Sequence, residues 1–155
     1  MNSCSFCQKI QQAAALPADE LIADLPRSIV LLGPWQFYRG YCLVVAKRHA
    51  TELTDLEKAE RQAYLDEMCA VGRAIAEIFK PRKLNYELLG NQVPHLHWHL
   101  FPRYPDDPDS RRAVWFAIER AEQDPEFHKQ LSGAKDNRGK IASTLRGQLA
   151  PKDGS

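Results

Sequence analysis

Hydrophobic side chains recur at helical spacing over residues 55–79 and predict the longest helix of the chain. Steps of four and three residues place one apolar stripe along this segment, formed by Tyr64, Met68, Val71, Ile75 and Ile78. Thr54 and Glu57 have the spacing of a capping box, which would satisfy two free amides at the start of the helix. Pro81 cannot continue the helical hydrogen-bond ladder, so we expect the helix to end just before it.

Short runs of aliphatic and β-branched residues predict strands on both sides of this helix, at residues 20–24, 28–32, 41–46, 84–89 and 95–101. The short connections within each group favour antiparallel pairing, so the predicted fold class is α+β. A Gln- and Ala-rich segment over residues 8–16 predicts a short helix before the first strand. From about residue 112, the pattern predicts one or two polar, solvated helices and a flexible tail.

Length and composition are those of one ordinary globular domain, with 155 residues, 44% hydrophobic and 26% charged. The net charge of +1 argues against a partner such as nucleic acid or a membrane surface, which would favour a basic protein. No apolar run is long enough to span a membrane, and the first residues lack the pattern of a signal peptide. We therefore expect a cytoplasmic protein whose four cysteines are metal ligands or buried thiols rather than disulfides.

Three histidines alternate along the last predicted strand, at positions 95, 97 and 99. Alternate residues of a strand share one face, so His95, His97 and His99 should form a row of imidazoles. The opposite face should be buried, because it carries Leu96, Trp98 and Leu100. We expect the imidazole row itself to lie on an accessible surface.

Such a row has several interpretations that spacing alone does not separate. A neutral imidazole could attack phosphorus while its neighbours hold phosphate oxygens. The three histidines could instead coordinate a catalytic zinc ion. A further alternative is a sensor that binds a nucleotide without turning it over. The plainest alternative is a surface strand that carries histidines without a function.

A second candidate is the pair Cys4 and Cys7, whose spacing is that of half a zinc site. A redox-active pair shares this spacing, but the βαβ context of a thioredoxin-like motif is missing here. A tetrahedral zinc site needs two more ligands, for which His49 and His95 are the candidates. Otherwise the two cysteines are free thiols and His49 caps a loop. Cys42 and Cys69 are expected to fill space.

The segment His95-Leu96-His97-Trp98-His99-Leu100-Phe101 resembles the alternating histidine signature of the histidine-triad (HIT) family. The flanking segments 90–94 and 102–104, Asn85 on the preceding strand and the run 43–49 ending in Lys-Arg-His are similar to bacterial members. The resemblance covers about residues 4–104. The chain departs from it at Arg39-Gly40-Tyr41, where many members have Pro-Gly-His.

The resemblance implies a sheet of about five antiparallel strands, one long helix and short helices at both ends. A catalytic part would occupy residues 1–110, and residues 111–155 would form a helical extension of the same domain. The implied reaction is cleavage at the α-phosphate of dinucleoside polyphosphates, such as diadenosine tetraphosphate, or of nucleoside phosphoramidates. His97 would be the nucleophile and form a nucleotidyl-histidine, while His99, Asn91 and Asn85 would contact the nucleotide.

The resemblance also implies a structural zinc ion held by Cys4, Cys7, His49 and His95. The main-chain carbonyl of His95 would then hold His97 in the tautomer that attacks phosphorus. Members of the family pair as two-fold dimers through the long helix and a central strand, so a homodimer is expected. The expected partners are therefore a nucleotide substrate and a second copy, with neither nucleic acid nor a membrane.

Overall fold

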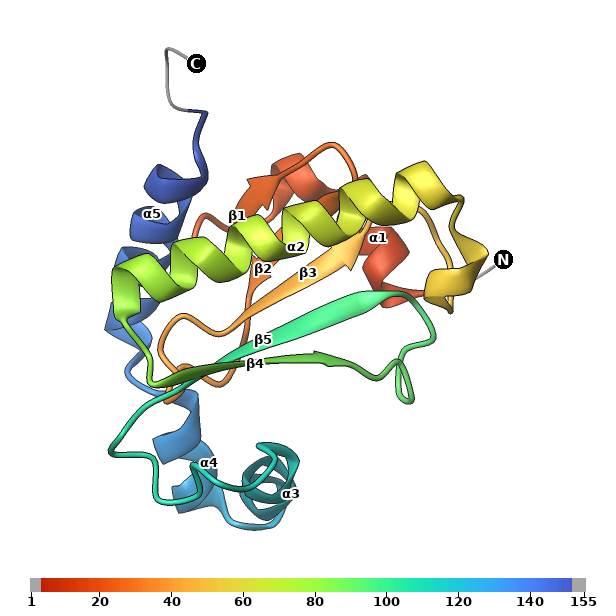
Figure 1. Cartoon of the computed structure of the whole chain (residues 1–155). Coiled ribbons are helices and arrows are strands. Elements are labelled where there is room, and N and C mark those ends of the chain that lie inside the picture. Colours follow the sequence, from red (N-terminus) through yellow and green to blue (C-terminus); the bar gives the residue numbers. More distant parts are fainter. Residues whose placement is uncertain (1–3, 152–155) are drawn as a thin grey trace.

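The computed structural model describes residues 4–151 and is built around a five-stranded antiparallel sheet with the order β1-β2-β3-β5-β4 (Figure 1). The α+β class and the antiparallel pairing predicted from the sequence are confirmed. Because β3 pairs with β5, segments more than fifty residues apart in the chain lie side by side at the centre. The strands are β1 Leu21–Asp24, β2 Ser28–Leu32, β3 Cys42–Ala46, β4 Lys83–Leu88 and β5 His97–Arg103.

The long helix α2, Lys58–Phe79, crosses one face of the sheet (Figure 1). Its predicted apolar stripe is confirmed, because Tyr64, Met68, Val71 and Ile75 are buried in the main hydrophobic core. The Tyr64 hydroxyl also donates to the carbonyl of Val44 on β3. The helix ends at Lys80 in the left-handed conformation, directly before Pro81. None of the helices within residues 4–151 is long and apolar enough to cross a membrane.

The predicted capping box at the start of α2 is wrong. A short 3₁₀ helix, η2 Leu53–Asp55, precedes α2, and the reciprocal capping pair is Glu52 with Asp55. The carboxylate of Asp55 accepts from the amides of Thr51 and Glu52, which fixes this earlier turn. Glu57 occupies the N-cap of α2 without a side-chain hydrogen bond.

The N-terminal helix α1, Ser5–Gln11, begins earlier than predicted and is followed by the 3₁₀ turn η1 Ala13–Ala15. It lies on the face of the sheet opposite α2 (Figure 1). Phe6 and Ile10 pack there against a buried cluster formed by Ala13, Ile29, Leu31 and Val45. This contact brings the two N-terminal cysteines to the sheet.

Three C-terminal helices follow β5, rather than the one or two predicted: α3 Trp115–Gln123, α4 Pro125–Ser132 and α5 Lys135–Leu149. The expectation of solvated helices is also wrong, because Ile141, Ala142 and Leu145 of α5 are buried in the main core beside α2. α3 and α4 pack with Tyr38 and Phe101 in a second cluster. The last four residues of the expected tail, 152–155, lie outside the described residues.

The burial of α5 predicts that this helix stabilises the whole domain. Leu145→Ala should lower the free energy of unfolding by about 2–5 kcal/mol, because it removes a fully buried side chain. The matched control is Ser143→Ala, an exposed position on the same helix, which should leave stability nearly unchanged. Urea denaturation followed by circular dichroism measures both, and equal stability of the two variants would contradict the packing of α5.

Candidate active site and metal cluster

The histidine row lies where β5 begins, on the sheet face opposite α2. His95 precedes the strand, and His97 and His99 are its first and third residues. All three are buried, at 0%, 6% and 9% exposure, so the expectation of an openly accessible row is wrong. Phe6 from α1 and Trp115 from α3 cover the rings. The predicted apolar underside is confirmed, because Leu96, Trp98 and Leu100 pack in the main core.

His97 is oriented by the backbone next to it. Its Nδ1 lies 2.6 Å from the carbonyl oxygen of His95, which can only accept, so Nδ1 carries the proton and donates. The Nε2 atom of the neutral ring therefore carries the lone pair. Burial lowers the pKa of His97 below its ordinary value, and the His95 carbonyl opposes this shift.

His99 is held by aromatic side chains. Its Nδ1 lies 2.7 Å from the hydroxyl of Tyr41, and the indole of Trp115 meets the ring edge-on at 5.1 Å. The ring stacks toward Phe101, its neighbour two residues along the strand. Burial, with a smaller effect of His97, lowers the pKa of His99 to about 4, so this imidazole is neutral at pH 7.

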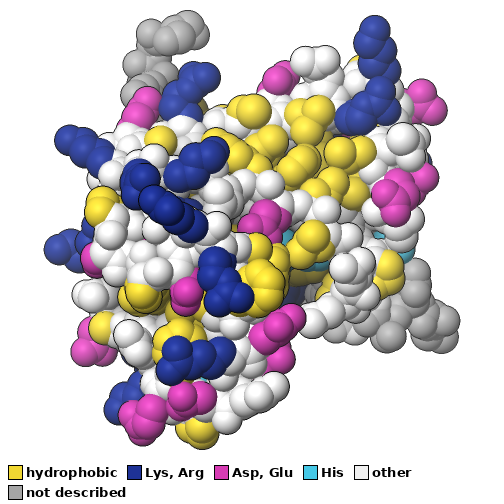
Figure 2. Space-filling view, turned by 60° about the horizontal axis from the view of Figure 1, so that its bottom comes forward, with side chains coloured by type: hydrophobic (Ala, Val, Ile, Leu, Met, Phe, Trp, Pro, Cys, Tyr) yellow, Lys and Arg dark blue, Asp and Glu magenta, His cyan; other side chains and the backbone are white. Residues whose placement is uncertain are grey.

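The outer ring nitrogens of His97 and His99 are the Nε2 atoms. Within residues 4–151, Trp98 Nε1 is the one fully buried polar side-chain atom without a hydrogen-bond partner. Among the described residues, no hydrogen-bond partner reaches the Nε2 atoms of His97 and His99, whose side chains are bound through Nδ1. Figure 2 shows histidine surface in a recess of one face of the molecule, beside hydrophobic and acidic side chains.

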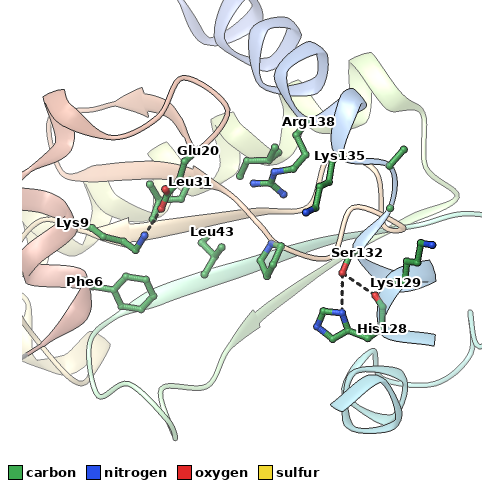
Figure 3. A pocket seen from close by; sticks show the side chains of 14 residues that line it. Phe6, Lys9, Glu20, Leu31, Leu43, His128, Lys129, Ser132, Lys135 and Arg138 are labelled. Atoms are coloured by element: carbon green, nitrogen blue, oxygen red, sulfur yellow. Dashed lines mark hydrogen bonds and ion pairs between the residues drawn. The ribbon is translucent and has the colours of Figure 1, made fainter. Parts of the chain in front are cut away.

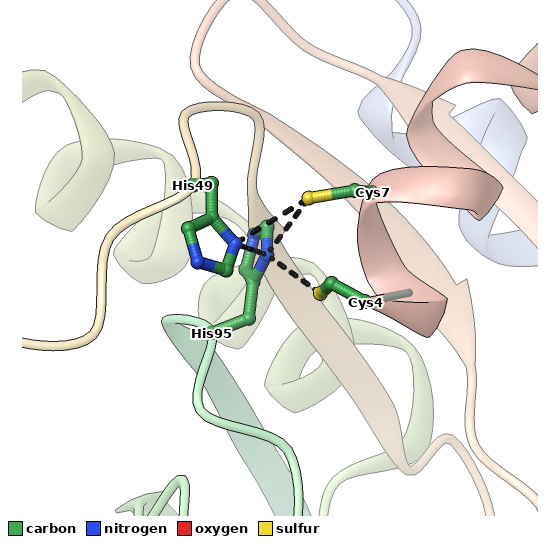
Figure 4. Close-up of side chains that lie close together, drawn as sticks. All are labelled: Cys4, Cys7, His49 and His95. Atoms are coloured by element: carbon green, nitrogen blue, oxygen red, sulfur yellow. Dashed lines mark hydrogen bonds between the residues drawn. The ribbon is translucent and has the colours of Figure 1, made fainter. Parts of the chain in front are cut away.

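A second cluster of side chains forms where α1 meets the entrance of β5. Cys4 is the N-cap of α1 and Cys7 lies in its first turn, while His49 comes from the loop after β3 and His95 from the segment before β5 (Figure 4). One ligand atom from each of the four lies within 4.8 Å of every other. The structure thus brings together all four residues that the resemblance named as zinc ligands.

The distances in this cluster fit one tetrahedral zinc ion. Three sulfur–Nδ1 pairs, Cys4 with His95 and Cys7 with each histidine, are 3.4–3.6 Å apart, and the two Nδ1 atoms lie 3.2 Å apart. Zinc bonds of about 2.3 Å to sulfur and about 2.0 Å to nitrogen would separate these atoms by about 3.5 Å and about 3.3 Å. A set of two thiolates and two imidazoles is a common structural zinc site and leaves no position for water.

The same cluster is connected to the catalytic candidate through His95. Its Nε2 donates to the carbonyl of Ala46 at 2.7 Å, which leaves Nδ1 free to face the two cysteines. Such a hydrogen bond to the second ring nitrogen is how metal-ligating histidines are usually oriented. The side chain of His95 thus belongs to the metal cluster while its carbonyl holds His97.

A cavity of about 800 Å³ is lined by residues of α1, β2, β3, α4 and α5 (Figure 3). Its floor includes Leu43, which lies opposite His99 in the β3–β5 pairing, and Leu31 on the next strand. Phe6 forms part of its wall and packs against the ring of His97 at 4.7 Å. The far wall comes from α4 and α5 and carries cationic side chains, namely Lys129, Lys135 and Arg138.

The two predicted amide contacts lie in different surroundings. Asn85 is on β4, opposite Phe101 of β5, and its Oδ1 accepts from Arg103 at 3.1 Å. Asn91 is exposed in the loop between β4 and β5, and no hydrogen bond joins it to the histidines within the described part of the chain. The structure therefore orients Asn85 but does not place Asn91 against the row.

Three residues near the row were missed by the sequence reasoning. Trp115 Nε1 donates to the carboxylate of Glu87, which lies opposite His99 in the β4–β5 pairing. Arg103 is buried, pairs with Asp107 and donates to two carbonyls of the loop that leads to α3. No local pattern marks the contact of Trp115 with Glu87, because the two residues are 28 positions apart in the chain.

The fold and the site define a small α+β domain in which one strand of the antiparallel sheet carries alternating histidines. The HIT domain family model matches residues 17–106. The chain therefore belongs to the HIT family.

Individual relatives agree with this assignment. "Protein hit" of Bacillus subtilis is 30% identical over 119 residues, which are 74% of this chain and 79% of the relative. An uncharacterized HIT-like protein of Mycoplasma genitalium is 27% identical over 108 residues, 66% of this chain and 74% of the relative. The crystal structure of a histidine triad protein from Bradyrhizobium japonicum superposes with a TM-score of 0.68 and 31% identity, covering 83% of this chain and 89% of that one.

The fold itself is shared more widely. A histidine triad protein from Marinobacter aquaeolei matches with a TM-score of 0.67 at 24% identity, covering 88% of this chain and 93% of the other. At this identity the match concerns the fold alone. It extends beyond residues 17–106, so the C-terminal helices are compatible with the same overall architecture.

The cluster geometry predicts that Cys7→Ser lowers stability first and activity second. Loss of one ligand weakens metal binding, and metal binding contributes free energy of folding. The control is Cys69→Ser, because Cys69 is exposed on α2, where it does not fill space as the sequence suggested. Metal content by mass spectrometry and the unfolding midpoint by calorimetry measure the effect. A metal-free Cys7→Ser variant with unchanged thermal stability would contradict the structural role.

Proposed function

We propose that this HIT protein is a nucleotide hydrolase or transferase that acts at the α-phosphate through a nucleotidyl group on His97. The substrates proposed are dinucleoside polyphosphates, such as diadenosine tetraphosphate, or nucleoside phosphoramidates. The observation that supports this most directly is the hydrogen bond from His97 Nδ1 to the His95 carbonyl, because it leaves Nε2 as a free nucleophile.

In the first step, the lone pair on His97 Nε2 attacks the α-phosphorus. A phosphorus–nitrogen bond forms, and the bond to the leaving group breaks with its electron pair. A nucleoside polyphosphate leaves as an anion, whereas the nitrogen of a phosphoramidate takes a proton from solvent. The His97 ring becomes positively charged, and the His95 carbonyl stabilises that charge through Nδ1–H.

In the second step, water or another acceptor attacks the same phosphorus. The phosphorus–nitrogen bond breaks, its electron pair returns to Nε2, and the attacking water loses one proton to solvent. A nucleoside monophosphate is released and His97 is again neutral. Imidazole suits both steps because it attacks at neutral pH and also leaves readily.

We propose that Cys4, Cys7, His49 and His95 hold a structural zinc ion. Zinc would join α1 to the turn before β5 and keep the His95 carbonyl in place. A catalytic zinc held by the three histidines fits the geometry poorly. His95 uses Nε2 for the Ala46 carbonyl and turns Nδ1 toward the cysteines, away from a site shared with His97 and His99.

We propose that the cavity beside the row holds the nucleoside. Its apolar floor, formed in part by Leu31 and Leu43, suits a base and ribose better than a phosphate chain. A nucleotide whose α-phosphate lies at His97 would extend over Leu43, because that side chain neighbours His99 across the strands.

The reaction predicts that His97→Ala and His97→Gly lose turnover of diadenosine tetraphosphate and of adenosine phosphoramidate. The loss should be about a thousandfold or more, because the group that forms the covalent bond is removed. Release of AMP, followed by chromatography, is the measurement. Ser143→Ala, an exposed position on α5 outside the cavity, is the control that keeps activity.

The same assay with and without a chelator tests the two alternatives. Loss of turnover on removing metal from a still-folded protein would favour a catalytic zinc ion. Tight AMP binding without turnover of either substrate would favour a nucleotide sensor. Undiminished turnover by His97→Ala would contradict the proposed nucleophile.

We also propose a two-fold homodimer that pairs through α2 and β4. β4 lies at the edge of the sheet, and Tyr86 and Leu89 expose 45% and 48% of their surface there. Figure 2 shows hydrophobic side chains gathered in the upper part of one face. Exposed apolar side chains at a strand edge are typical of a surface that is covered by another chain.

The dimer predicts that Leu89→Lys shifts the protein to monomers, because a charge replaces an apolar contact at the interface. Phe116→Lys is the control, since Phe116 is equally exposed but lies on α3. Sedimentation velocity distinguishes the two forms. A monomeric wild-type protein at high concentration would contradict this proposal.

A further inference from the structure

Tyr41 is buried at the start of β3 and touches the end of the histidine row. Its ring stacks on Phe101 with centroids 3.8 Å apart, and 2% of its surface is exposed. Its hydroxyl lies 2.7 Å from Nδ1 of His99. This is the position at which the chain has Arg39-Gly40-Tyr41 in place of the Pro-Gly-His pattern.

The direction of this hydrogen bond follows from the partners that are present. Within residues 4–151, His99 Nδ1 is the one group within hydrogen-bond distance of the Tyr41 hydroxyl. If Nδ1–H donated to the phenol, the buried phenolic proton would have no acceptor, which is costly. If the phenol donates, both groups are satisfied. Burial raises the pKa of Tyr41 far above neutrality, so the hydroxyl always has a proton to give.

We propose that Tyr41 is a positioning residue, which donates to His99 Nδ1 and thereby fixes this ring in the tautomer with its proton on Nε2. His97 has the opposite tautomer, because its Nδ1 donates to the His95 carbonyl. The two rings lie 4.8 Å apart on one strand face. The row thus presents a lone pair and an N–H group next to each other.

This pairing matches what phosphoryl transfer requires. The lone pair attacks phosphorus, and the neighbouring N–H donates to a phosphate oxygen as charge develops on it. A neutral donor fixed in advance needs no change of protonation during the reaction. This catalytic part of the inference rests on the proposed function, whereas the assignment of the tautomer does not.

Other contacts keep the His99 ring from turning. Trp115 meets the ring edge-on, and its Nε1 is engaged by Glu87, so this indole is itself held. Arg103 donates hydrogen bonds to the carbonyls of Asp109 and Arg112 and so fixes the loop that leads to α3. The C-terminal extension therefore contributes to the position of His99, although the family model ends before it.

Nitrogen-15 NMR of histidine-labelled protein at pH 7.5 tests the tautomers directly. In the wild type, we expect the proton of His99 on Nε2 and that of His97 on Nδ1. Tyr41→Phe keeps the ring stack and removes the hydroxyl, so His99 should become a mixture of tautomers. Tyr38→Phe is the control, because Tyr38 packs edge-on to the same Phe101 but does not touch His99. A wild-type His99 with its proton on Nδ1 would overturn the proposal, as would an unchanged pattern in Tyr41→Phe.

Kinetics of the same variants test the catalytic part. Removal of one hydrogen-bond donor to a developing oxyanion lowers kcat by about 10²–10³. Tyr41→Phe keeps the donor, His99, and removes only the group that orients it, so we expect a smaller loss of about tenfold in kcat. We expect this loss in kcat for Tyr41→Phe with little change in KM, and none for Tyr38→Phe. If the tautomers are as expected but Tyr41→Phe keeps full kcat, the catalytic role of the donor is wrong. If His97→Ala also keeps turnover, the proposed function fails while the tautomer assignment stands.

Discussion

The hydrogen bond from His97 to the carbonyl of His95 is the constraint on which the rest of the candidate active site depends. His97 Nδ1 lies 2.6 Å from the carbonyl oxygen of His95, and this bond leaves Nε2 as the nitrogen of His97 that carries the lone pair. A backbone carbonyl can orient a ring only if the backbone itself is fixed. Here the side chain of His95 fixes it, through the Ala46 carbonyl on one nitrogen and the cysteine cluster on the other.

Burial of the row has a cost that its hydrogen bonds offset. Three imidazoles leave water, yet each has a nitrogen engaged by a carbonyl or a hydroxyl. Burial in turn keeps the rings neutral, as the lowered pKa values of His97 and His99 indicate. A cavity with an apolar floor, formed in part by Leu31 and Leu43, lies next to the row, because Leu43 is paired with His99. The same hydrogen bonds therefore stabilise the buried rings and set the protonation of His97 and His99 that the proposed reaction needs.

The sequence predicts the parts of this structure that local periodicity determines. The stripe of α2 from Tyr64 to Ile75 and the alternation of His97 and His99 with buried neighbours follow from helix and strand geometry. The four residues of the metal cluster could be proposed because Cys4 and Cys7 have a characteristic spacing, His49 and His95 were candidates for the other ligands, and the resemblance implied the same set. Their meeting in space is what the fold adds.

The remaining contacts join residues far apart in the chain, so no local pattern marks them. Tyr41 meets His99 across 58 positions, and Arg138 of α5 donates to Gly33 across 105. The cover over the row, from Phe6 and Trp115, likewise depends on packing between distant helices. The predicted capping box is wrong for a different reason, because Thr54 lies inside the 3₁₀ helix η2, which Glu52 and Asp55 cap.

The account rests on the division of the three histidines into a support, a nucleophile and a donor. The most direct test is to mix the protein rapidly with diadenosine tetraphosphate, stop the reaction in alkali and map the modified peptide by mass spectrometry. The account predicts an adenylyl group on His97, lost in acid, and none on His95 or His99. An adduct on His99, or turnover without any adduct, would contradict it.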